Sequence, residues 1–457
     1  MKKKYLKKFA CVSLAATMAL TLTACGGQSS GNSNDNAGTN TESSTGNDTD
    51  TNTDNNAGES AADNAEAAGN VNYKGNVNYV DIAKQLQADQ TVDLNGLSSE
   101  KYSITGYAQG YDFDDAWMGA ITQMASSGCE VILGSGSSDF AFNFGGVDRT
   151  NSELKVGGVD SLTHAFQDLL DGGVYTFCAG SYPSMIAPAY ASVIRALEGN
   201  KLIDADGNPA SIGMSHWIAT SSDELADMIA NDCAGNYAVD TGLFSQMLTC
   251  DYDTFMKLAE NIDYDTMMTN KAAFADTEKV SLSKAYKIGV LINDTTSDES
   301  LSYQEYAKYL ADEFGFTVTF SESTGGAPTE ETNQIQTWAS AGYDAVISMS
   351  SGSIYDQADL CASNGMVLEM YAAHPMAEDK ADLDTLESYC GAVGPTTYNE
   401  AEVGYKLAKY YIEQGYTKYA IFGGSIAFGA ETHAYRVAGI FAAMIEDETG
   451  VTCEDFN

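Results

Sequence analysis

The chain has 457 residues, and 64 acidic residues against 23 Lys and Arg give it a formal net charge of −41. This excess of carboxylates argues against a nucleic-acid-binding protein, because contacts to phosphates need clustered Lys and Arg. Charge does not specify a fold, so the organisation of the chain has to come from its segments, taken in order.

The N-terminal segment has the pattern of a secretion signal. Five lysines occur among the first eight residues, and an apolar run follows from Phe9 to Leu22. This predicts a signal peptide over residues 1–24. The run ends in LTACG (22–26), which resembles a bacterial lipobox, where cleavage precedes the cysteine and its sulfur is lipidated. An ordinary signal with a cysteine nearby is the alternative. We expect a lipid anchor at Cys25, on the extracellular face of the cell membrane of a Gram-positive bacterium.

The next segment, 25–72, consists almost only of Gly, Ser, Asn, Asp, Thr, Ala and Glu. Such a composition cannot bury enough apolar surface to offset the entropy of ordering, so it predicts a flexible tether. About 385 residues remain beyond it, which is enough for two domains. No other stretch has 18 or more consecutive apolar residues, so no membrane span is expected.

The cysteines and histidines of this remaining part carry little signal. Seven cysteines lie there: Cys129, Cys178, Cys233, Cys250, Cys361, Cys390 and Cys453. Their number is odd and they form no CxxC, so a disulfide framework is not expected, although one pair stays open. The histidines, His164, His216, His374 and His433, lack metal-ligand spacing, and no metal site is expected.

Strands and helices alternate along the rest of the chain. Buried strands ending in small or polar residues are expected at 101–110, 129–137, 153–161, 174–182, 212–220, 287–294, 316–322, 343–349, 366–372 and 418–425. Helices are expected at 113–127, 162–171, 184–199, 299–314, 399–415 and 431–446, with further helical stretches within 205–285. The helix at 299–314 places Tyr303, Tyr306, Ala307, Leu310 and Phe314 on one face. This alternation predicts an α/β protein with doubly wound parallel sheets.

Two parts of the chain carry a family resemblance. KIGVLINDTTSDESLSY, AGYDAVISMSS, the hinge-like GAVGPTTYNEAEVGYKLAKYYI and GYTKYAIFGGSIAFGAETHAYRVAGIFAAM all lie within 287–446. This part resembles the type I periplasmic binding proteins of ABC importers, which include the ribose-binding type and are related to the LacI-type regulator core. The stretch 102–202 resembles the second half of the same family, so the halves come in reversed order. A circularly permuted chain explains this order; a truncated chain or a fusion of unrelated halves is the alternative.

The resemblance implies two Rossmann-like lobes joined by a hinge. Residues 73–182 would form one part of the second lobe, and 395–457 would hold the hinge and the start of that lobe. The first lobe would comprise 286–394, and residues 183–285 would return to it and join the family's old termini. Between 129–137 and 153–161 the family's full helix is replaced by a short glycine-containing segment, so that wall of the cleft is expected to differ.

The resemblance also implies a function. We expect a monomeric solute-binding protein that captures a small polar ligand between its lobes and delivers it to ABC permease subunits without changing it. A ligand-sensing module for a membrane receptor and a surface hydrolase are the alternatives. Beyond the tether the chain has no G-x-S-x-G, H-E-x-x-H or P-loop motif, so no catalytic residue or cofactor is expected.

Candidate ligand contacts follow the strands, because open parallel sheets bind ligands beyond their carboxyl ends. The candidates on the first lobe are Asn293, Asp294, Ser297, Ser350 and Tyr371. Those on the second lobe are Tyr111, Trp117, Ser137, Ser181, Tyr182 and Phe428.

Three further candidates match family positions. Arg436 in YRVAGI matches an arginine that bonds ligand oxygens, Asp160 in VGGVDS a strand-end aspartate, and Phe113 in YDFDDAW an aromatic that stacks on the ligand. Their structural alternatives are helix packing or an exposed position, a turn or helix cap, and core packing. The Asp-Arg pair of the family's sugar binders is absent from LEMYAAHP, which shifts the expected ligand toward a polar uncharged or zwitterionic molecule.

Overall fold

The computed structural model describes residues 78–89, 99–110, 115–136, 138–151, 153–292, 294–322, 327–349, 353–372, 374–375, 377–427 and 431–456. All of these residues fall within one compact unit, Asp63–Asn457. The expected signal peptide, tether and lipidated Cys25 lie outside the described residues. So do six expected ligand contacts: Tyr111, Phe113, Ser137, Asn293, Ser350 and Phe428.

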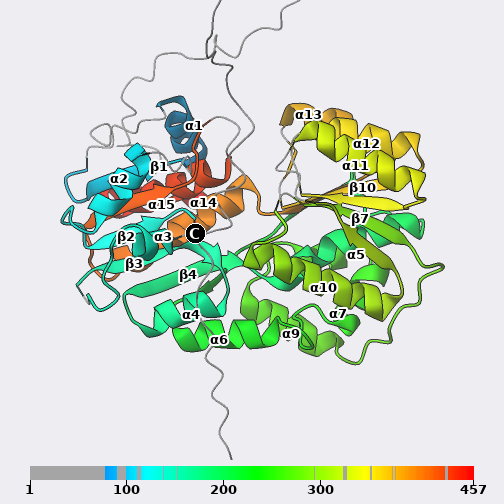
Figure 1. Ribbon diagram of the computed structural model, residues 1–457, viewed down its shortest axis with the longest axis horizontal. Helices are drawn as coiled ribbons and strands as arrows, with labels where there is room; N and C mark the ends of the chain where they lie inside the picture. Colours follow the sequence, from blue (N-terminus) through cyan, green and yellow to red (C-terminus); the bar gives the residue numbers. More distant parts are fainter. Residues whose placement is uncertain are drawn as a thin grey trace, which may run out of the picture. The chain divides into compact units, whose positions relative to one another are not determined.

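The first of two six-stranded sheets, called here the β12 sheet, has the order β1-β12-β2-β3-β4-β6 (Figure 1). Its strands are β1 (Ser103–Gln109), β12 (Lys418–Gly423), β2 (Val131–Gly134), β3 (Lys155–Ser161), β4 (Tyr175–Ser181) and β6 (Trp217–Ala219). The first five pair in parallel, and only β6 runs antiparallel to its neighbour. The carboxyl ends of five strands therefore lie at one edge.

The second sheet, called here the β7 sheet, has the order β5-β11-β10-β9-β7-β8 and is parallel throughout. Its strands are β5 (Ala210–Gly213), β11 (Tyr389–Gly394), β10 (Val367–Tyr371), β9 (Ala345–Ser348), β7 (Lys287–Leu291) and β8 (Thr317–Phe320). Nearly continuous burial of β9 and β11 is what strands covered on both faces require. The protein is thus α/β with two parallel-dominated sheets.

Helices cover both faces of the sheets. They are α1 (Tyr79–Asp89), α2 (Asp115–Met124), α3 (Phe140–Asn143), α4 (His164–Asp171), α5 (Ala187–Leu197), α6 (Ser222–Asn231), α7 (Thr241–Thr249), α8 (Tyr252–Ala259), α9 (Tyr264–Phe274), α10 (Asp298–Phe314), α11 (Pro328–Ser340), α12 (Ile354–Ser363), α13 (Ala377–Leu383), α14 (Thr397–Ile412) and α15 (Glu431–Thr449), with 3₁₀ turns η3 (Pro183–Ile186) and η4 (Glu454–Phe456). On the β12 sheet, α14 packs on β2, β3 and β4, while α2 and α4 pack on β1 and β4. On the β7 sheet, α5 packs on β9, β10 and β11, and α11 and α12 on β7, β9 and β10.

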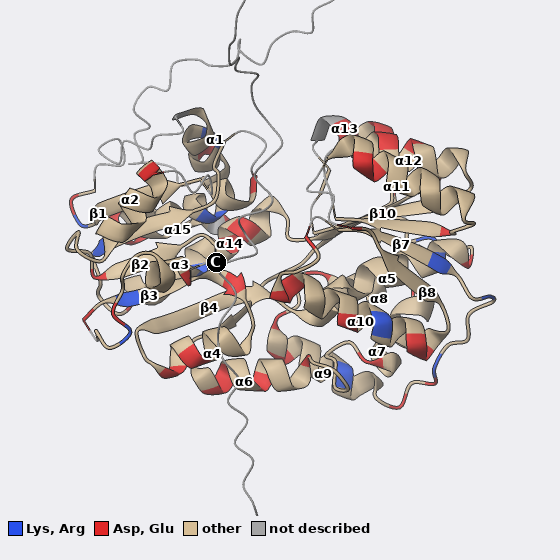
Figure 2. Ribbon diagram, viewed as in Figure 1, with Lys and Arg blue, Asp and Glu red and all other residues tan. Residues whose placement is uncertain are grey.

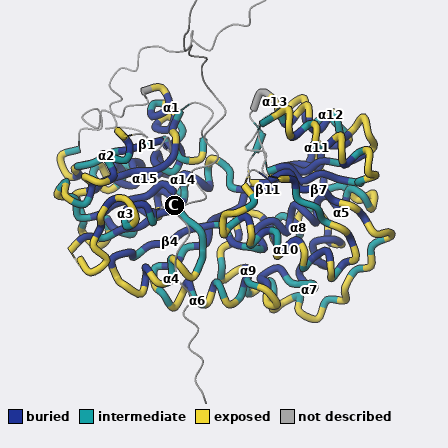
Figure 3. Tube along the Cα trace, in the orientation of Figure 1, coloured by how far each residue is buried: buried dark blue, intermediate teal, exposed yellow. Residues whose placement is uncertain are grey.

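The core consists of three groups of buried apolar side chains. One lies between the β12 sheet and α1, α14 and α15, and another between the β7 sheet and α11 and α12. The largest group is shared, since it contains Ile132 of β2 together with Ile288 of β7 and Ile347 of β9. Figure 3 shows the inner strands of both sheets as buried and many outer turns of the helices as exposed, whereas β1 and β8 are mostly half-buried.

The expected elements are confirmed with one exception. The face of α10 formed by Tyr303, Tyr306, Ala307, Leu310 and Phe314 is buried, as its spacing predicts. The helix between β2 and β3 is short, since α3 has four residues. The single strand expected at 212–220 is wrong. Gly213 ends β5 in one sheet and Trp217 begins β6 in the other, so the run IGMSHWIAT contributes to both.

The chain passes between the two sheets four times in the described part. It leaves β4 through η3 to reach α5, returns from β5 to β6, passes from α6 to α7, and finally runs from β11 into α14. A capping box fixes the last entry, because the Thr396 side chain accepts from the Asn399 backbone and the Asn399 side chain accepts from the Thr396 backbone. These four connections link the two sheets within one compact unit.

The first and last described elements lie side by side. Helix α1 packs on α15, and the Tyr79 ring lies 5.1 Å from the Phe456 ring and 6.0 Å from the Tyr435 ring. The Gln87 side chain donates to Glu431 Oε2 at 3.0 Å. Beyond α1, the Ser103 backbone donates to the Thr417 carbonyl at 2.9 Å, which starts the pairing of β1 with β12.

Candidate functional site

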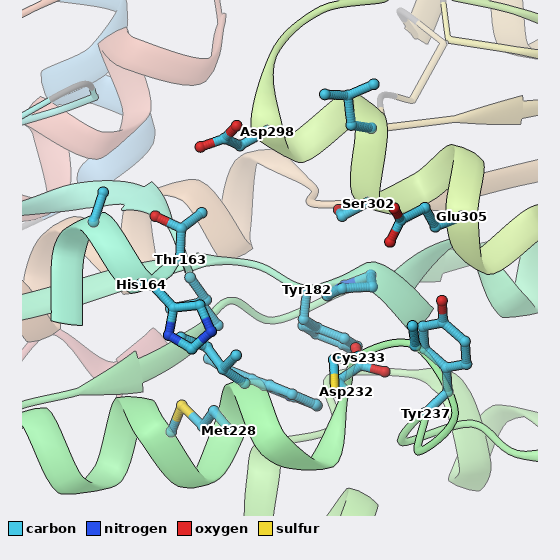
Figure 4. Close-up of a pocket in the computed structure, with 17 residues that line it drawn as sticks. Thr163, His164, Tyr182, Met228, Asp232, Cys233, Tyr237, Asp298, Ser302 and Glu305 are labelled. Carbon is cyan, nitrogen blue, oxygen red and sulfur yellow. The ribbon is translucent and has the colours of Figure 1, made fainter. Parts of the chain in front are cut away.

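A pocket of about 410 Å³ lies where β3, β4 and β7 lead into the helices that follow them (Figure 4). Its walls come from the β3–α4 connection, the start of η3, the end of α6 and the first two turns of α10. The described lining residues are Leu162, Thr163, His164, Ala165, Tyr182, Pro183, Trp217, Met228, Ile229, Asp232, Cys233, Ala234, Tyr237, Asp298, Leu301, Ser302 and Glu305. This volume is within the range of small-molecule sites.

Stacked aromatic rings form the buried part of the pocket. Tyr182 and Trp217 lie 3.7 Å apart between ring centroids and 6° from parallel, and each is only 1% exposed. Strand pairing brings them together, because Gly180 of β4 opposes Trp217 in β6. Tyr237 adds a third ring, held 4.8 Å from both Tyr306 and Tyr309 of α10.

Three lining side chains carry a buried polar atom that has no hydrogen-bond partner among the described residues. These atoms are Thr163 Oγ1, the Tyr182 hydroxyl and Trp217 Nε1. Burial, with a smaller contribution from Asp232, raises the pKa of Tyr182 well above its usual range, so this hydroxyl remains protonated. Leaving a buried donor or acceptor unmatched costs about 1–3 kcal/mol. A bound molecule or water that forms hydrogen bonds with these three atoms would therefore remove this cost.

Asp232 lies in the pocket wall, but its acceptor sites are already used. It accepts from the Ser184 backbone at 2.9 Å, from Ser184 Oγ at 3.0 Å and from the Ala238 backbone at 2.9 Å. Burial raises its pKa to about 6, against the opposing effect of these hydrogen bonds and of Lys271. Asp232 thus ties η3 to the loop after α6 and fixes the shape of the wall.

The wall formed by α10 is acidic and open to solvent. Ser297 caps this helix, since its side chain accepts from the Ser300 backbone. Asp298 lies in the first turn and Glu305 two turns later, both exposed and both lining the pocket. No Lys or Arg occurs among the described lining residues. Figure 2 shows further Asp and Glu residues on the nearby helices α4 and α6.

A second polar group lies at the carboxyl edge of the β12 sheet. Arg436 on α15 donates through Nε to Glu400 Oε2 at 2.6 Å and through a terminal nitrogen to the Ser135 carbonyl at 2.8 Å. His216 Nε2 lies 3.3 Å from the same Glu400 oxygen. Burial opposes ionisation of Glu400, but the charges of Arg436 and His216 outweigh it and lower the pKa to about 2. His433 Nδ1, 3.0 Å from Ser135 Oγ, has its pKa lowered to about 4 by burial and by Arg436.

The edge of this sheet is closely packed around Ser135. A Cβ added at Gly423 would lie 1.8 Å from Ser135 Oγ and 3.0 Å from Ser135 Cβ, so a larger residue would require the Ser135 side chain to move. The neighbouring Gln109, at the end of β1, has both amide atoms buried without a hydrogen-bond partner among the described residues. The carboxyl edge of the β12 sheet therefore holds both the Arg436–Glu400 ion pair and the Gln109 amide, which has no hydrogen-bond partner among the described residues.

Asp160 is the last residue but one of β3 and is held by internal hydrogen bonds. It accepts from the Ser138 backbone at 2.6 Å and from the Tyr175 hydroxyl at 2.7 Å, and Ser138 Oγ donates to its second oxygen. Burial raises its pKa, while these hydrogen bonds oppose that effect. It does not cap α4, whose N-cap is Thr163. The described contacts thus make Asp160 a link between β3, β4 and the β2–α3 connection.

The expected contacts on α10 and its approach have local partners. Asp294 is exposed and accepts from the Thr296 and Ser297 backbones at 3.0 and 2.8 Å, which forms the turn before the helix.

Trp117, another candidate contact, lies on α2; it is 5% exposed and packs edge-on against Phe140 of α3, with 5.9 Å between the ring centroids.

Ser181 and Tyr371, from different sheets, both meet Tyr303 of α10. The Tyr303 hydroxyl donates to Glu299 Oε1 at 2.9 Å, and its ring lies 5.5 Å from the Tyr371 ring at 89°. Burial, followed by the Glu299 charge and Tyr371, raises the pKa of Tyr303, while a hydrogen bond with Ser181 opposes the rise. Of the described candidates from the sequence, only Tyr182 lines the pocket.

Most pocket residues were not expected from the sequence. Trp217 stood inside a stretch read as one strand, and Met228, Asp232 and Tyr237 belong to a segment read as a connection between old termini. Asp298 lies in the first turn of α10, where acidic residues are common for electrostatic reasons alone, and Glu305 lies two turns into the same helix. No local pattern distinguishes them from solvated surface residues.

Comparison with protein-family models and with the curated proteins adds no relative. No protein-family model matches the chain, and no match was found among the curated proteins.

The described residues hold no group of three or more His, Cys, Asp or Glu side chains placed to bind a metal ion. All seven cysteines from Cys129 to Cys453 are free thiols. Within the described part, no helix is both long and apolar enough to cross a bilayer.

Proposed function

We propose that this chain is a solute-binding protein of the type I periplasmic class, anchored by a lipid at Cys25, that captures a small ligand and delivers it to an ABC importer. The observation that carries the proposal is the strand order of the two sheets. Read from β7, the β7 sheet has the order second-first-third-fourth-fifth, β8-β7-β9-β10-β11. The β12 sheet repeats this order, β1-β12-β2-β3-β4, if β12 is counted as its first strand.

This repeated order also supports the circular permutation. Counting β12 first requires the chain to continue from its end to its beginning, and α1 does pack on α15 beside η4. Each sheet then gains a sixth strand beside its fifth, β5 next to β11 and β6 next to β4. The passage from α6 to α7 lies inside the segment 205–285, to which we assign the join between the old termini.

The pocket supports capture of a small molecule. Doubly wound sheets bind ligands outside the carboxyl ends of their strands, and this pocket follows β3 and β4 of one sheet and β7 of the other. A ligand held there would contact both halves, which is how hinge closure is coupled to binding. The described lining offers aromatic rings and hydrogen-bonding groups, and binding needs no chemical step.

Ligand-induced stabilisation tests the proposal. The purified full chain would be melted with separate panels of sugars, nucleosides, amino acids and amines. A ligand at about 100 times its Kd adds about 2.7 kcal/mol. For a unit of 395 residues (63–457) this corresponds to about 3 °C in Tm. Recovery of the ligand unchanged would support binding over hydrolysis. Absence of any shift across all panels would refute the proposal.

The permutation has a separate test. A gene that starts at Lys284, runs to Asn457, continues through a short linker to Asn78 and ends at Ser283 restores the proposed family order. It should give a soluble protein with one cooperative melting transition and the same ligand response as the natural order. Aggregation of this chain, while the natural order folds under the same conditions, would count against the permutation.

A further inference from the structure

The pocket is lined by acidic side chains and, in its buried part, by aromatic rings. Three carboxylates, Asp232, Asp298 and Glu305, line it, and the described lining contains no Lys or Arg. Asp232 is occupied by hydrogen bonds from Ser184 and Ala238, whereas Asp298 and Glu305 are exposed on α10. From this arrangement we propose that the solute is an organic cation, and specifically a linear polyamine. The inference rests on the proposed function, because it names the ligand class of that site.

The spacing of the two exposed carboxylates favours a ligand with more than one charge. Asp298 and Glu305 are seven residues apart on one helix, which is two turns and about 10.5 Å along the axis. Leu301 and Ser302 lie between them and also line the pocket. An extended chain with an ammonium group at each end can meet both carboxylates while its methylene groups pass over the Leu301 side chain, which is 46% exposed. A single compact cation meets only one of them.

The aromatic side chains suit the same ligand. Tyr182, Trp217 and Tyr237 line the pocket, and an ammonium group is attracted to the electron-rich face of a Tyr or Trp ring. The unmatched oxygens of Thr163 and Tyr182 can accept hydrogen bonds from ammonium N–H groups. Trp217 Nε1 is a donor only, so it requires an oxygen from water or from another ligand group.

The acidic surface of the whole chain is the competing explanation. With 64 Asp and Glu against 23 Lys and Arg, any face attracts cations to some extent. The chain provides a matched control for this effect. Asp312 is exposed on the same helix, seven residues beyond Glu305, and it does not line the pocket. If cations are attracted only by the general acidic surface, removing the charge at position 298, 305 or 312 should weaken ligand binding equally.

Calorimetric titration of the purified full chain with spermidine tests the inference, with a neutral diol of the same length as the second probe. We expect saturable binding of spermidine near one per chain, and binding of the diol at least tenfold weaker. Asp298→Asn and Glu305→Gln should each weaken spermidine by about two- to fivefold, the range for exposed ion pairs, and the double variant by about tenfold. Asp312→Asn should leave the affinity unchanged. Circular dichroism would show that each variant retains its helix content.

Three outcomes would overturn the inference, and they separate it from the proposed function. Equal losses with Asp312→Asn would show attraction to the general surface. Tight binding of a neutral sugar or nucleoside that is indifferent to Asp298→Asn and Glu305→Gln would overturn the polyamine and leave solute binding intact. No binding of spermidine or of any panel compound would overturn both.

Discussion

Replacing Arg436 by methionine should destabilise the protein even without ligand. The guanidinium is held by Glu400 and the Ser135 carbonyl, and the Glu400 side chain is only 9% exposed. Glu400 has a pKa of about 2, against 4.5 for an unperturbed glutamate. A shift of this size corresponds to about 3 kcal/mol of stability at neutral pH. Arg436→Met leaves the carboxylate buried with His216 alone, and we expect a loss of similar size.

The pH dependence of this effect has a defined sign. Because the pKa of Glu400 is lower in the folded state, its contribution is complete above about pH 4.5 and is lost as the pH falls through 2. At pH 3, between the folded and unfolded pKa values, less than the full contribution remains. A double variant, Glu400→Met with Arg436→Met, should recover part of the loss, since neither charge then remains buried alone.

Thermal melting of the full chain measures these differences. The unit 63–457 has 395 residues, and an unfolding entropy of about 2.1 cal/mol/K per residue converts 3 kcal/mol into about 4 °C. Arg436→Met should therefore melt about 4 °C below the parent at pH 7, with a smaller difference at pH 3. A variant that melts within about 1 °C of the parent at pH 7, or a double variant less stable than Arg436→Met, would refute this account of the ion pair.

Three further predictions concern packing and the pocket. Gly439→Ala should cost about 1–3 kcal/mol, because its Cβ would lie 1.9 Å from a carbonyl oxygen of α14. Gly119→Ala should not destabilise, because no atom of the described residues lies within 4 Å of the added Cβ. Urea unfolding measures both free energies, and equal changes for the two variants would show that α14 and α15 move apart to accommodate the methyl group. Alkylation of Cys233, a partly exposed thiol in the pocket wall, should slow when ligand is bound while that of Cys129 does not, and equal rates by mass spectrometry would place the ligand elsewhere. Tyr182→Phe should leave unliganded stability within about 0.5 kcal/mol, because its hydroxyl has no hydrogen-bond partner among the described residues, and a larger loss in a thermal melt would show that the hydroxyl is satisfied.

The local pattern of the sequence determined most elements. Strands such as β7 and β9 are short apolar runs bounded by polar or small residues, and α10 repeats its buried side chains with helical spacing. These signals depend on neighbours within one or two turns, which the sequence displays directly. The α/β class follows from their alternation along the chain. The reduced α3 follows likewise from the brevity of the segment between β2 and β3.

Only the tertiary structure decided which segments meet. The run at 212–220 is divided between two sheets because its ends pair with different strands, β11 and β4, and nothing in its own composition marks the division. Arg436 contacts Ser135 across a separation of 301 residues, and Tyr182 stacks on Trp217 through the pairing of β4 with β6. Such contacts depend on strand order and on the passage of the chain between sheets. The pocket is built from them, so its residues could not be read from local pattern, whereas the helices and strands that support it could.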